Sequence, residues 1–470
     1  MKIIPHYSRI KRRYINELGR MRLMSKPWMS GGLLMISVII AMLLANLPFT
    51  KEIYHAILHT SLSMSIQSPI DAETGARAIN WIFPKDMTVE KFINDILMVV
   101  FFFTVGLEIK REIVCGELSN MKKALLPVIA AMGGMLLPAL IYTCVNHGTS
   151  AASGWGIPTA TDIAFAVGIM SILGDRVPVS LKIFLTALAI ADDLGAILVV
   201  AFFYGGKVNL VLLLIAALIL VLVFLLNKYG EKRMIFYLIP AIAVWFLFYY
   251  AGIHATMSGV VMAMMIPMDA RYSRPYFEKK NAKYINLIYK YQDNDISPNF
   301  HQRTCLRNIS HVARGTVGMS YRLEHALNPW VNFLIMPIFA IANAGVEIPD
   351  LSYFNFFQFS PEIGSVGIGI FFGLLLGKPI GITFASWIAI KLKVGEMPAG
   401  ASWKMLFAVA CLGGIGFTMS IFVDTLSFGE LAPELTQHLR SLGKIAVLSG
   451  SLCAGLLGSA LITLFSKNNK

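Results

Sequence analysis

The chain has 470 residues, of which 56% are hydrophobic and only 14% are charged, and it carries a formal net charge of +13. A soluble protein would contain roughly 25% charged residues, so the composition excludes a soluble globular protein. It indicates a helical protein that crosses a membrane several times.

Apolar runs recur along the whole sequence, most of them close to the roughly 20 residues that a helix needs to cross a bilayer. They predict an all-α polytopic membrane protein with about twelve transmembrane helices, forming a single transporter domain over residues 1–470. The expected spans are 31–48, 94–108, 122–144, 155–174, 180–204, 209–227, 234–250, 252–269, 329–345, 365–390, 404–424 and 438–466.

Lysine and arginine alternate between the segments that join these spans. Eight precede the first span, ten lie in the segment 270–328, and the segments 145–154 and 346–364 contain none. Positive residues favour the cytoplasmic side, so both termini, including the segment 1–28, are expected in the cytoplasm. The basic excess then reflects topology and contact with anionic membrane lipid, and it predicts no nucleic-acid partner.

Two connecting segments are long enough to carry structure of their own. Residues 49–93 are expected outside the cytoplasm, where AINWIFPKDMTV alternates weakly and is compatible with a short hairpin. Residues 270–328 form a long cytoplasmic loop, for which an amphipathic surface helix and a partly disordered connector both remain open. The five cysteines lack metal-type spacing and are expected to be reduced packing residues.

Two of the expected spans are interrupted near their centres. GWGIPTATDIAFAVG, in the span 155–174, contains Gly154, Gly156 and Pro158, and CLGGIGFTMS, in the span 404–424, contains three glycines. Interrupted spans at corresponding positions of two halves are typical of inverted-repeat transporters, whose substrate site lies where the half-helices meet.

Charged residues accompany both interruptions. Asp192 and Asp193 sit in the middle of the 25-residue run VSLKIFLTALAIADDLGAILVVAFF, Asp162 lies in the first interrupted span, and Lys378 lies in the span 365–390. Ionised groups in hydrocarbon cost several kcal/mol unless they are neutralised. Two buried carboxylates bind either protons or a small cation with oxygen ligands, so a site loaded by one or the other would perform exchange. Thr161 and backbone carbonyls freed after Pro158 are further oxygen ligands.

Buried aspartates also occur in proteins of other functions. An intramembrane aspartyl protease also uses two buried aspartates, but these come from different helices, whereas here the pair is contiguous and a GxGD motif is absent. A proton- or sodium-coupled symporter of an organic solute fits the same architecture, but the spans lack arginine or aromatic clusters for a large anion. A channel needs no titratable binding pair at the midplane.

Six blocks of the sequence resemble the NhaA family of sodium/proton antiporters. They are FFFTVGLEIKREIVCGEL (101–118), GWGIPTATDIAFAVGIMSILGDRVPVSLKIFLTALAIADDLGAI (154–197), GIHATMSGV (252–260), RLEHALNPWVNFLIMPIFAIANAGV (322–346), GLLLGKPIGI (373–382) and CLGGIGFTMSIF (411–422). The resemblance implies two unwound helices that cross, electrogenic exchange of Na⁺ or Li⁺ for H⁺ across the bacterial inner membrane, and a homodimer. It implies no cofactor and no enzymatic activity.

The resemblance also assigns roles to the charged residues. Asp193 matches the principal cation-binding aspartate, and Asp192 matches the aspartate that pairs with the lysine at Lys378. Thr161 and Asp162 match the Thr-Asp pair at the crossing, where Asp162 and Lys378 would compensate the partial charges of the half-helix ends. The expected ligands of Na⁺ or Li⁺ are Asp193, Asp192 and Thr161.

A second group of residues matches a charged cytoplasmic cluster that the family links to pH regulation. Its members are Glu108, Arg111, Glu112, Glu324 and His325, joined by His254 in GIHATMSG. The sequence departs from some family members at Asn328, which replaces a second histidine, and in the unusual length of the segment 270–328. Both departures put the expected pH profile in doubt, but not the transport chemistry.

Overall fold

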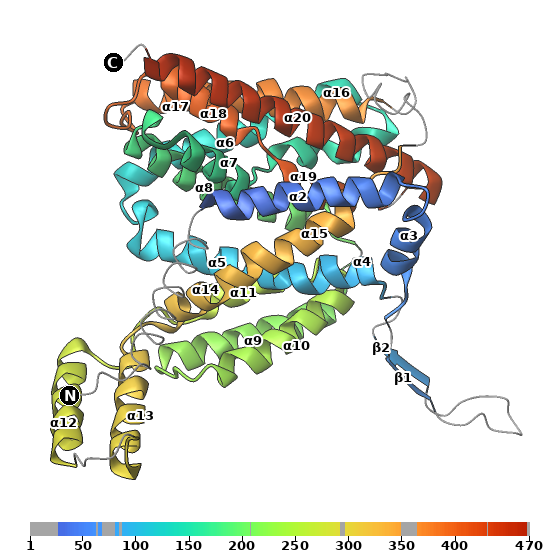
Figure 1. The fold of residues 1–470 in the computed structure, drawn as a ribbon. Helices are drawn as coiled ribbons and strands as arrows, with labels where there is room; N and C mark the ends of the chain where they lie inside the picture. The colour runs from blue at the N-terminus through green and yellow to red at the C-terminus, as the bar shows by residue number, and fades with distance from the viewer. Residues whose placement is uncertain are drawn as a thin grey trace, which may run out of the picture. The chain divides into compact units, whose positions relative to one another are not determined.

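Apolar helices make up most of the computed structural model (Figure 1). The structure describes residues 27–62, 64–67, 80–83, 87–206, 208–291, 297–348, 364–429 and 431–467. The described residues contain nine helices that are long and apolar enough to cross a membrane, and a bent helix pair adds a tenth. The polytopic helical fold expected from the sequence is therefore confirmed, whereas most of the segment 1–28 lies outside the described residues.

The chain divides into two compact units, and the larger one comprises residues 1–98, 112–206 and 329–470. In chain order, its elements are α2 (Pro27–Asn46), α3 (Lys51–His59), β1 (Met64–Gln67), β2 (Asn80–Phe83), α4 (Val89–Phe92), η1 (Ile93–Leu97), η2 (Glu117–Ser119), α6 (Met121–Asn146), η3 (Ser150–Thr159), α7 (Ile163–Leu173), η4 (Gly174–Arg176), α8 (Val179–Phe203), η5 (Val331–Ile335), α15 (Met336–Asn343), α16 (Val366–Phe372), η7 (Gly373–Gly377), α17 (Lys378–Lys391), α18 (Trp403–Gly413), α19 (Phe417–Ser427) and α20 (Pro433–Lys467).

The second unit comprises residues 99–111 and 207–328. It contains most of α5 (Met98–Cys115), then α9 (Leu210–Lys228), α10 (Ile235–Ala251), α11 (Met257–Met265), α12 (Arg274–Lys290), α13 (Phe300–Gly315) and most of α14 (Met319–Trp330).

One of the expected spans is much shorter in the structure than the sequence predicts. The helix α10 has 17 residues and matches the expected span 234–250 in length, whereas α11 has only 9, although the apolar run predicts a span over 252–269. Gly252 ends α10 in the left-handed conformation at φ 81°, and the helix resumes only at Met257. Glycine adopts this conformation without steric cost, so it can end a helix inside an apolar run. The hydropathy pattern alone does not show such an end.

Polar side chains set the beginnings of several helices. Asp162 caps α7, Ser365 caps α16, Ser402 caps α18 and Asn209 caps α9, each by accepting a hydrogen bond from a backbone N–H of the first turn. These N–H groups have no partner within the helix, so a side-chain oxygen satisfies them where water is scarce.

Small residues bring α6 and α17 together within the first unit. A Cβ atom at Gly133 would lie 2.4 Å from the carbonyl oxygen of Gly381, and one at Gly381 would lie 2.2 Å from that of Gly133. Only glycine at both positions permits this approach, which is a common way for membrane helices to pack. The contact holds α17 against α6 at Gly381, which is three residues after Lys378.

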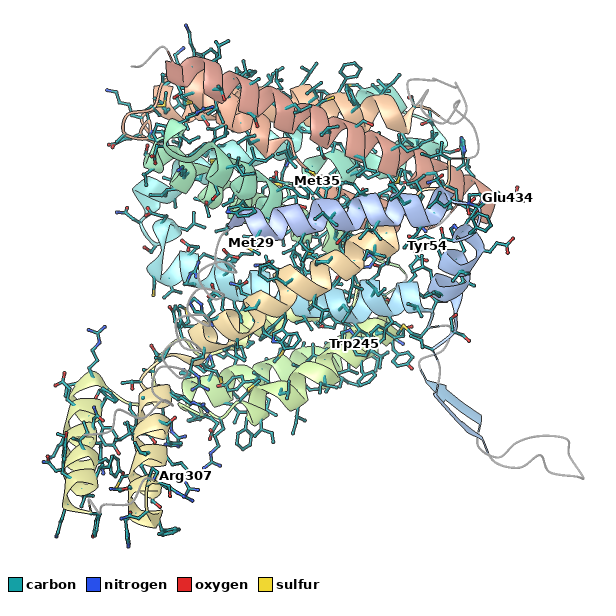
Figure 2. The ribbon with its side chains drawn as sticks, in the orientation of Figure 1. Met29, Met35, Tyr54, Trp245, Arg307 and Glu434 are labelled. Carbon is teal, nitrogen blue, oxygen red and sulfur yellow. The ribbon has the colours of Figure 1, made fainter. Side chains whose placement is uncertain are left out.

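The extracytoplasmic segment expected over 49–93 contains a helix and two strands. The strands β1 and β2 pair in antiparallel register, with Met64 opposite Phe83 and Gln67 opposite Asn80. The helix α3 is tied to α15 by Tyr54, whose hydroxyl donates to the carbonyl oxygen of Ile341 at 2.7 Å (Figure 2). Burial raises the pKa of Tyr54, so this hydroxyl keeps the proton that it donates.

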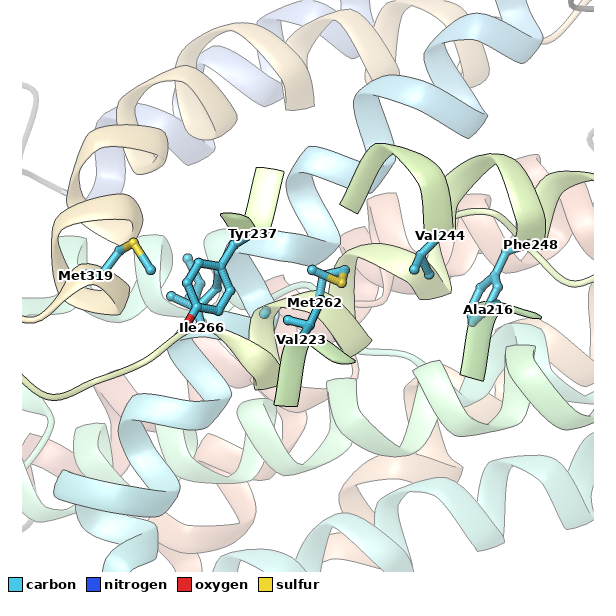
Figure 3. Packing of buried hydrophobic residues seen from close by; sticks show 10 residues of the cluster. Ala216, Val223, Tyr237, Val244, Phe248, Met262, Ile266 and Met319 are labelled. Atoms are coloured by element: carbon cyan, nitrogen blue, oxygen red, sulfur yellow. The ribbon is translucent and has the colours of Figure 1, made fainter. Parts of the chain in front are cut away.

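An apolar core holds the second unit together. Ten buried residues form it: they come from α5, α9, α10, α11 and α14, together with Ile266 directly after α11, and among them are Val223, Tyr237, Val244 and Met262 (Figure 3). The segment 270–328 adds α12 and α13, which pack side by side (Figure 1). Arg307 lies on α13 (Figure 2). Residues 292–296, between these two helices, lie outside the described residues.

Candidate functional site

Two interrupted helices meet in the first unit. The first consists of η3, the extended residues Ala160–Asp162 and α7, and the second consists of α18 and α19, which are bent by 48° around Gly414–Gly416. The backbone N–H of Asp162 donates to the carbonyl oxygen of Ile415 at 2.7 Å, and the hydroxyl of Thr161 donates to that of Gly413 at 2.8 Å. The expected crossing of two unwound helices is confirmed.

Asp162 joins two helix N-termini at this crossing. One carboxylate oxygen accepts from the N–H of Phe165 in the first turn of α7, at 3.2 Å. The other accepts from the N–H of Thr418 in α19 at 3.2 Å and from the Thr418 hydroxyl at 2.5 Å. Each N-terminus carries roughly half a positive charge, so a single carboxylate compensates both.

Lys378 and Asp192 form a buried ion pair beside the crossing. The ammonium nitrogen lies 2.6 Å from Oδ2 of Asp192 and also donates to the hydroxyl of Thr161. Both charged side chains are 1% exposed. The pair connects α8 to α17, and Thr161 extends it to the Gly413 carbonyl at the end of α18. A buried ion pair is held in this way only when hydrogen bonds satisfy its remaining donors.

The backbone just before Lys378 is a π-helical turn, η7. Pro379 follows and offers no N–H, so the usual helical hydrogen-bond pattern is disturbed at this point. Such single-turn π-helical segments inside α-helices are frequent at functional sites. This turn places the lysine on α17 where it reaches α8.

Asp193 is buried next to this ion pair. Its side chain points about 100° away from that of Asp192 around the helix axis, because the two residues are neighbours on α8. Its carboxylate nevertheless acts electrostatically on Lys378, to a smaller extent than Asp192 does. The neighbouring acids Asp192 and Asp193 therefore have different surroundings.

The oxygens near the crossing define what this site could bind. Within the described ranges, no three His, Cys, Asp or Glu side chains gather as a metal cluster. A cation here would take the Asp193 carboxylate together with hydroxyl and backbone oxygens, which suits a hard cation such as Na⁺. Asp192 still offers Oδ1, which has no hydrogen-bond partner among the described residues, whereas the Thr161 hydroxyl already serves Lys378 and Gly413.

The second unit contains most of the cluster that the sequence analysis associates with pH regulation. Arg111 on α5 contacts Oε1 of Glu324 on α14 at 2.5 Å and lies 3.9 Å from Oε1 of Glu108. Glu324 is buried, and His325 packs edge-on against Tyr321 with ring centroids 4.1 Å apart. The structure thus brings Glu108, Arg111 and Glu324 together.

The other two residues of that group have different contacts. Glu112 belongs to the first unit, where its Oε2 accepts from the backbone N–H of Glu117 at 3.1 Å. His254 lies in the break between α10 and α11, where its carbonyl oxygen accepts from the N–H of Met257 at 3.0 Å.

Some residues of the site do not stand out in the sequence. Thr418 is visible only as part of a glycine-rich break, and its bond to Asp162 depends on a contact 256 positions away. Asp424, a fully buried acid near the end of α19, is the last residue of the expected span 404–424, and an acid at the end of an apolar run is itself a signal.

The comparisons with known proteins agree with this geometry. The model of the family described as Na+/H+ antiporter 1 matches residues 21–462. The chain is 41% identical over 444 residues to the Na(+)/H(+) antiporter NhaA of Oleidesulfovibrio alaskensis, which covers 94% of this chain and 92% of that protein. It is 41% identical over 439 residues to the protein of the same name from Pelagibacter ubique, covering 93% of this chain and 95% of the relative.

A more distant likeness exists among solved structures. The sodium proton antiporter MjNhaP1 from Methanocaldococcus jannaschii is 12% identical, covers 93% of this chain and gives a TM-score of 0.46, which by itself does not establish a common fold. The family match spans nearly the whole chain, and the curated relatives are aligned over more than nine-tenths of their lengths. The chain therefore belongs to the NhaA family of Na⁺/H⁺ antiporters.

Proposed function

We propose that the chain is a secondary active antiporter that exports Na⁺ or Li⁺ in electrogenic exchange for H⁺ and so serves sodium and pH homeostasis. The observation that carries this proposal is the buried Asp192-Asp193 pair beside Lys378, at the crossing of two interrupted helices. The names of the aligned relatives, Na(+)/H(+) antiporter NhaA, support it.

The proposed mechanism depends on competition for one carboxylate. Asp193 binds either the cation or a proton, because a hard cation and a proton use the same carboxylate oxygens. A bare Asp193 carboxylate in a dry interior costs several kcal/mol, so the site reorients only when it is loaded. Binding of either ion expels the other, and alternate access to the two sides turns that competition into exchange.

The neighbouring residues hold this carboxylate in place. Lys378 neutralises Asp192 and leaves Asp193 as the acid available for exchange, while Thr161 supplies a hydroxyl oxygen between Lys378 and the crossing. Asp162 compensates the N-termini of α7 and α19. These four residues therefore set the electrostatics around the cation and proton site.

Everted membrane vesicles test the proposal directly. A pH gradient is imposed and monitored with a fluorescent amine, and the addition of Na⁺ or Li⁺ should dissipate it. Asp193→Asn should abolish the response, because an amide carries no negative charge with which to bind a proton or a cation. Asp175→Asn, which changes an acid in the turn η4 before α8, should respond like the wild type. A fully active Asp193→Asn variant would refute the assignment.

The distribution of basic residues supports the proposed placement of the chain. We assign it to the bacterial inner membrane with both termini, the segment 1–28 and the segment 270–328 in the cytoplasm, and the segment 49–93 on the opposite side. The family resemblance supports a homodimer. Cross-linking of the protein in native membranes would test this state.

The Arg111–Glu324 ion pair supports a regulatory role for the second unit. We assign pH regulation to Glu108, Arg111, Glu324 and His325, with Glu112 and His254 as further members. A buried glutamate paired with arginine is a group whose protonation breaks a contact between two helices, here α5 and α14.

A further inference from the structure

A second buried acid lies on α19, away from the crossing. Asp424 is fully buried, and neither of its carboxylate oxygens has a hydrogen-bond partner among the described residues. An unbonded carboxylate in a protein interior is costly, so its presence calls for a compensating charge or a functional role.

The structure around Asp424 is shaped to admit it. Its Oδ1 approaches the backbone of α20 so closely that a Cβ atom at Gly443 would lie 2.2 Å from that oxygen. A glycine at this position leaves room for the carboxylate, and any side chain there would displace it. The acid therefore fits a space formed by α20.

Two basic residues on α20 provide the compensating charge. Lys444 and Arg440 both act electrostatically on Asp424, although neither forms an ion pair with it in the described part of the chain. Glu90 on α4 acts on Lys444 in turn, and Arg440 donates to the carbonyl oxygen of Thr425. The formal charges of Asp424, Glu90, Lys444 and Arg440 sum to zero.

Hydroxyl groups from two other elements also face this region. The phenols of Tyr142 on α6 and Tyr204 at the end of α8 both experience the field of Asp424. Tyr142 donates to the carbonyl oxygen of Ala151, and Tyr204 donates to that of Ser153, so both tyrosines also bind η3. The acid thus lies among α19, α20 and the residues that hold η3.

The position of Asp424 along α19 connects it to the ion site. It follows Thr418, which bonds Asp162 at the crossing, by six residues, or about 9 Å along the helix axis. In the orientation proposed above, α19 runs from the crossing toward the outside. Asp424 therefore lies on the part of α19 that leads from the crossing toward the outside.

We propose that Asp424 is a second carboxylate on the ion path, which offsets the positive charges of Lys444 and Arg440 and thereby lets Na⁺ pass between the crossing and the outer face. The proposal rests on the proposed antiport function. Without this acid, the remaining charges of the cluster sum to +1, which disfavours a cation on that side of the site.

Sodium uptake into vesicles of the two opposite orientations tests this inference, because each orientation exposes one face to the bath. At constant ionic strength, Asp424→Asn should raise the half-saturating Na⁺ concentration at the outer face roughly three- to tenfold. Lys444→Gln removes a positive charge from the same cluster and should lower that concentration. Neither variant should change the value at the inner face by as much.

The opposite signs separate a role in ion passage from a structural one. A merely structural cluster would make both variants lose activity in the same direction, with equal effects at both faces, and that result would overturn the inference. If Asp424→Asn does not fold, as judged by thermal unfolding in detergent, Lys444→Gln decides alone: a half-saturating concentration at the outer face that does not fall contradicts the proposal.

Measuring Asp193→Asn in the same assay separates failure of this inference from failure of the proposed antiport function. If Asp193→Asn abolishes uptake at both faces while Asp424→Asn and Lys444→Gln behave like the wild type, the further inference fails and the proposed function stands. If Asp193→Asn remains active, the proposed function fails first.

Discussion

The residues around Lys378 are organised by the cost of burying charge. An ammonium group that is almost fully buried needs a carboxylate at contact distance, and Asp192 supplies it at 2.6 Å. The Thr161 hydroxyl occupies another of the three donors of the ammonium. Asp193 acts on the same lysine more weakly, so the two neighbouring acids of α8 differ in how strongly they are compensated.

Removal of Lys378 should therefore destabilise the protein as well as alter transport. Lys378→Ala leaves Asp192 buried without its partner, and breaking a buried pair in this way costs about 3–5 kcal/mol. Thermal unfolding in detergent should show a clearly lowered midpoint. Lys391→Ala, at the exposed end of the same helix, removes only a cation–π contact with Trp387 and should cost less than about 1 kcal/mol. Equal midpoints for the two variants would contradict this account.

At the scale of helices, close approach between backbones determines where the site residues lie. The glycines at 133 and 381 let α6 and α17 touch, and α17 carries Lys378. The crossing of α7 and α19 depends on Asp162, which caps both helices. Packing of small residues and shared caps therefore position the charged groups.

A methyl group at Gly381 should disturb this arrangement. Gly381→Ala places a Cβ 2.2 Å from a backbone oxygen, which cannot rotate away, so α17 must move and stability should fall by about 1–3 kcal/mol. Gly32→Ala in α2 meets no atom within 4 Å and should be neutral or slightly stabilising. Unfolding midpoints of the two variants provide the measurement, and a Gly381→Ala protein as stable as the Gly32→Ala protein would exclude a tight contact.

The sequence predicts the helices and their interruptions better than it predicts their partners. Hydropathy and glycine patterns locate the spans and both breaks because these are local properties. The bond from Thr418 to Asp162 and the ion pair from Arg111 to Glu324 join residues more than 200 positions apart, and no local pattern encodes them. The pairing of Lys378 with Asp192 rather than Asp193 was expected only from the family resemblance.

At the scale of the whole molecule, the proposed ion site and the ion pair proposed for regulation belong to different compact units. Asp162, Asp192, Asp193 and Lys378 lie in the first unit, and the Arg111–Glu324 pair lies in the second. Neither Arg111 nor Glu324 is a proposed ligand of the cation, so we expect regulation by that pair to act on the equilibrium between transport states.

This separation leads to a specific expectation for pH dependence. Glu324→Gln mimics the protonated glutamate at every pH, so any step that depends on ionisation of Glu324 disappears, and the rise of exchange rate with pH should flatten. The half-saturating Na⁺ concentration at the optimal pH should remain close to that of the wild type. Exchange rates in proteoliposomes over a range of pH values provide the measurement.

Glu278→Gln is the matched control, because Glu278 is exposed on α12. Its pH profile should coincide with that of the wild type. A Glu324→Gln profile that also coincides with the wild type would remove Glu324 from the regulatory group.

The Asp192–Lys378 ion pair also has an electrical consequence. While the pair is intact it contributes no net charge, and Asp193 is neutral with either one Na⁺ or one proton bound. Both loaded forms then cross the membrane without carrying current. A current requires that the ion pair itself carry the second proton, either gained by Asp192 in the proton-loaded form or lost from Lys378 in the Na⁺-loaded form, and either change removes the charge attraction across the 2.6 Å contact. Membrane current per sodium ion transported therefore reports how often this one ion pair opens.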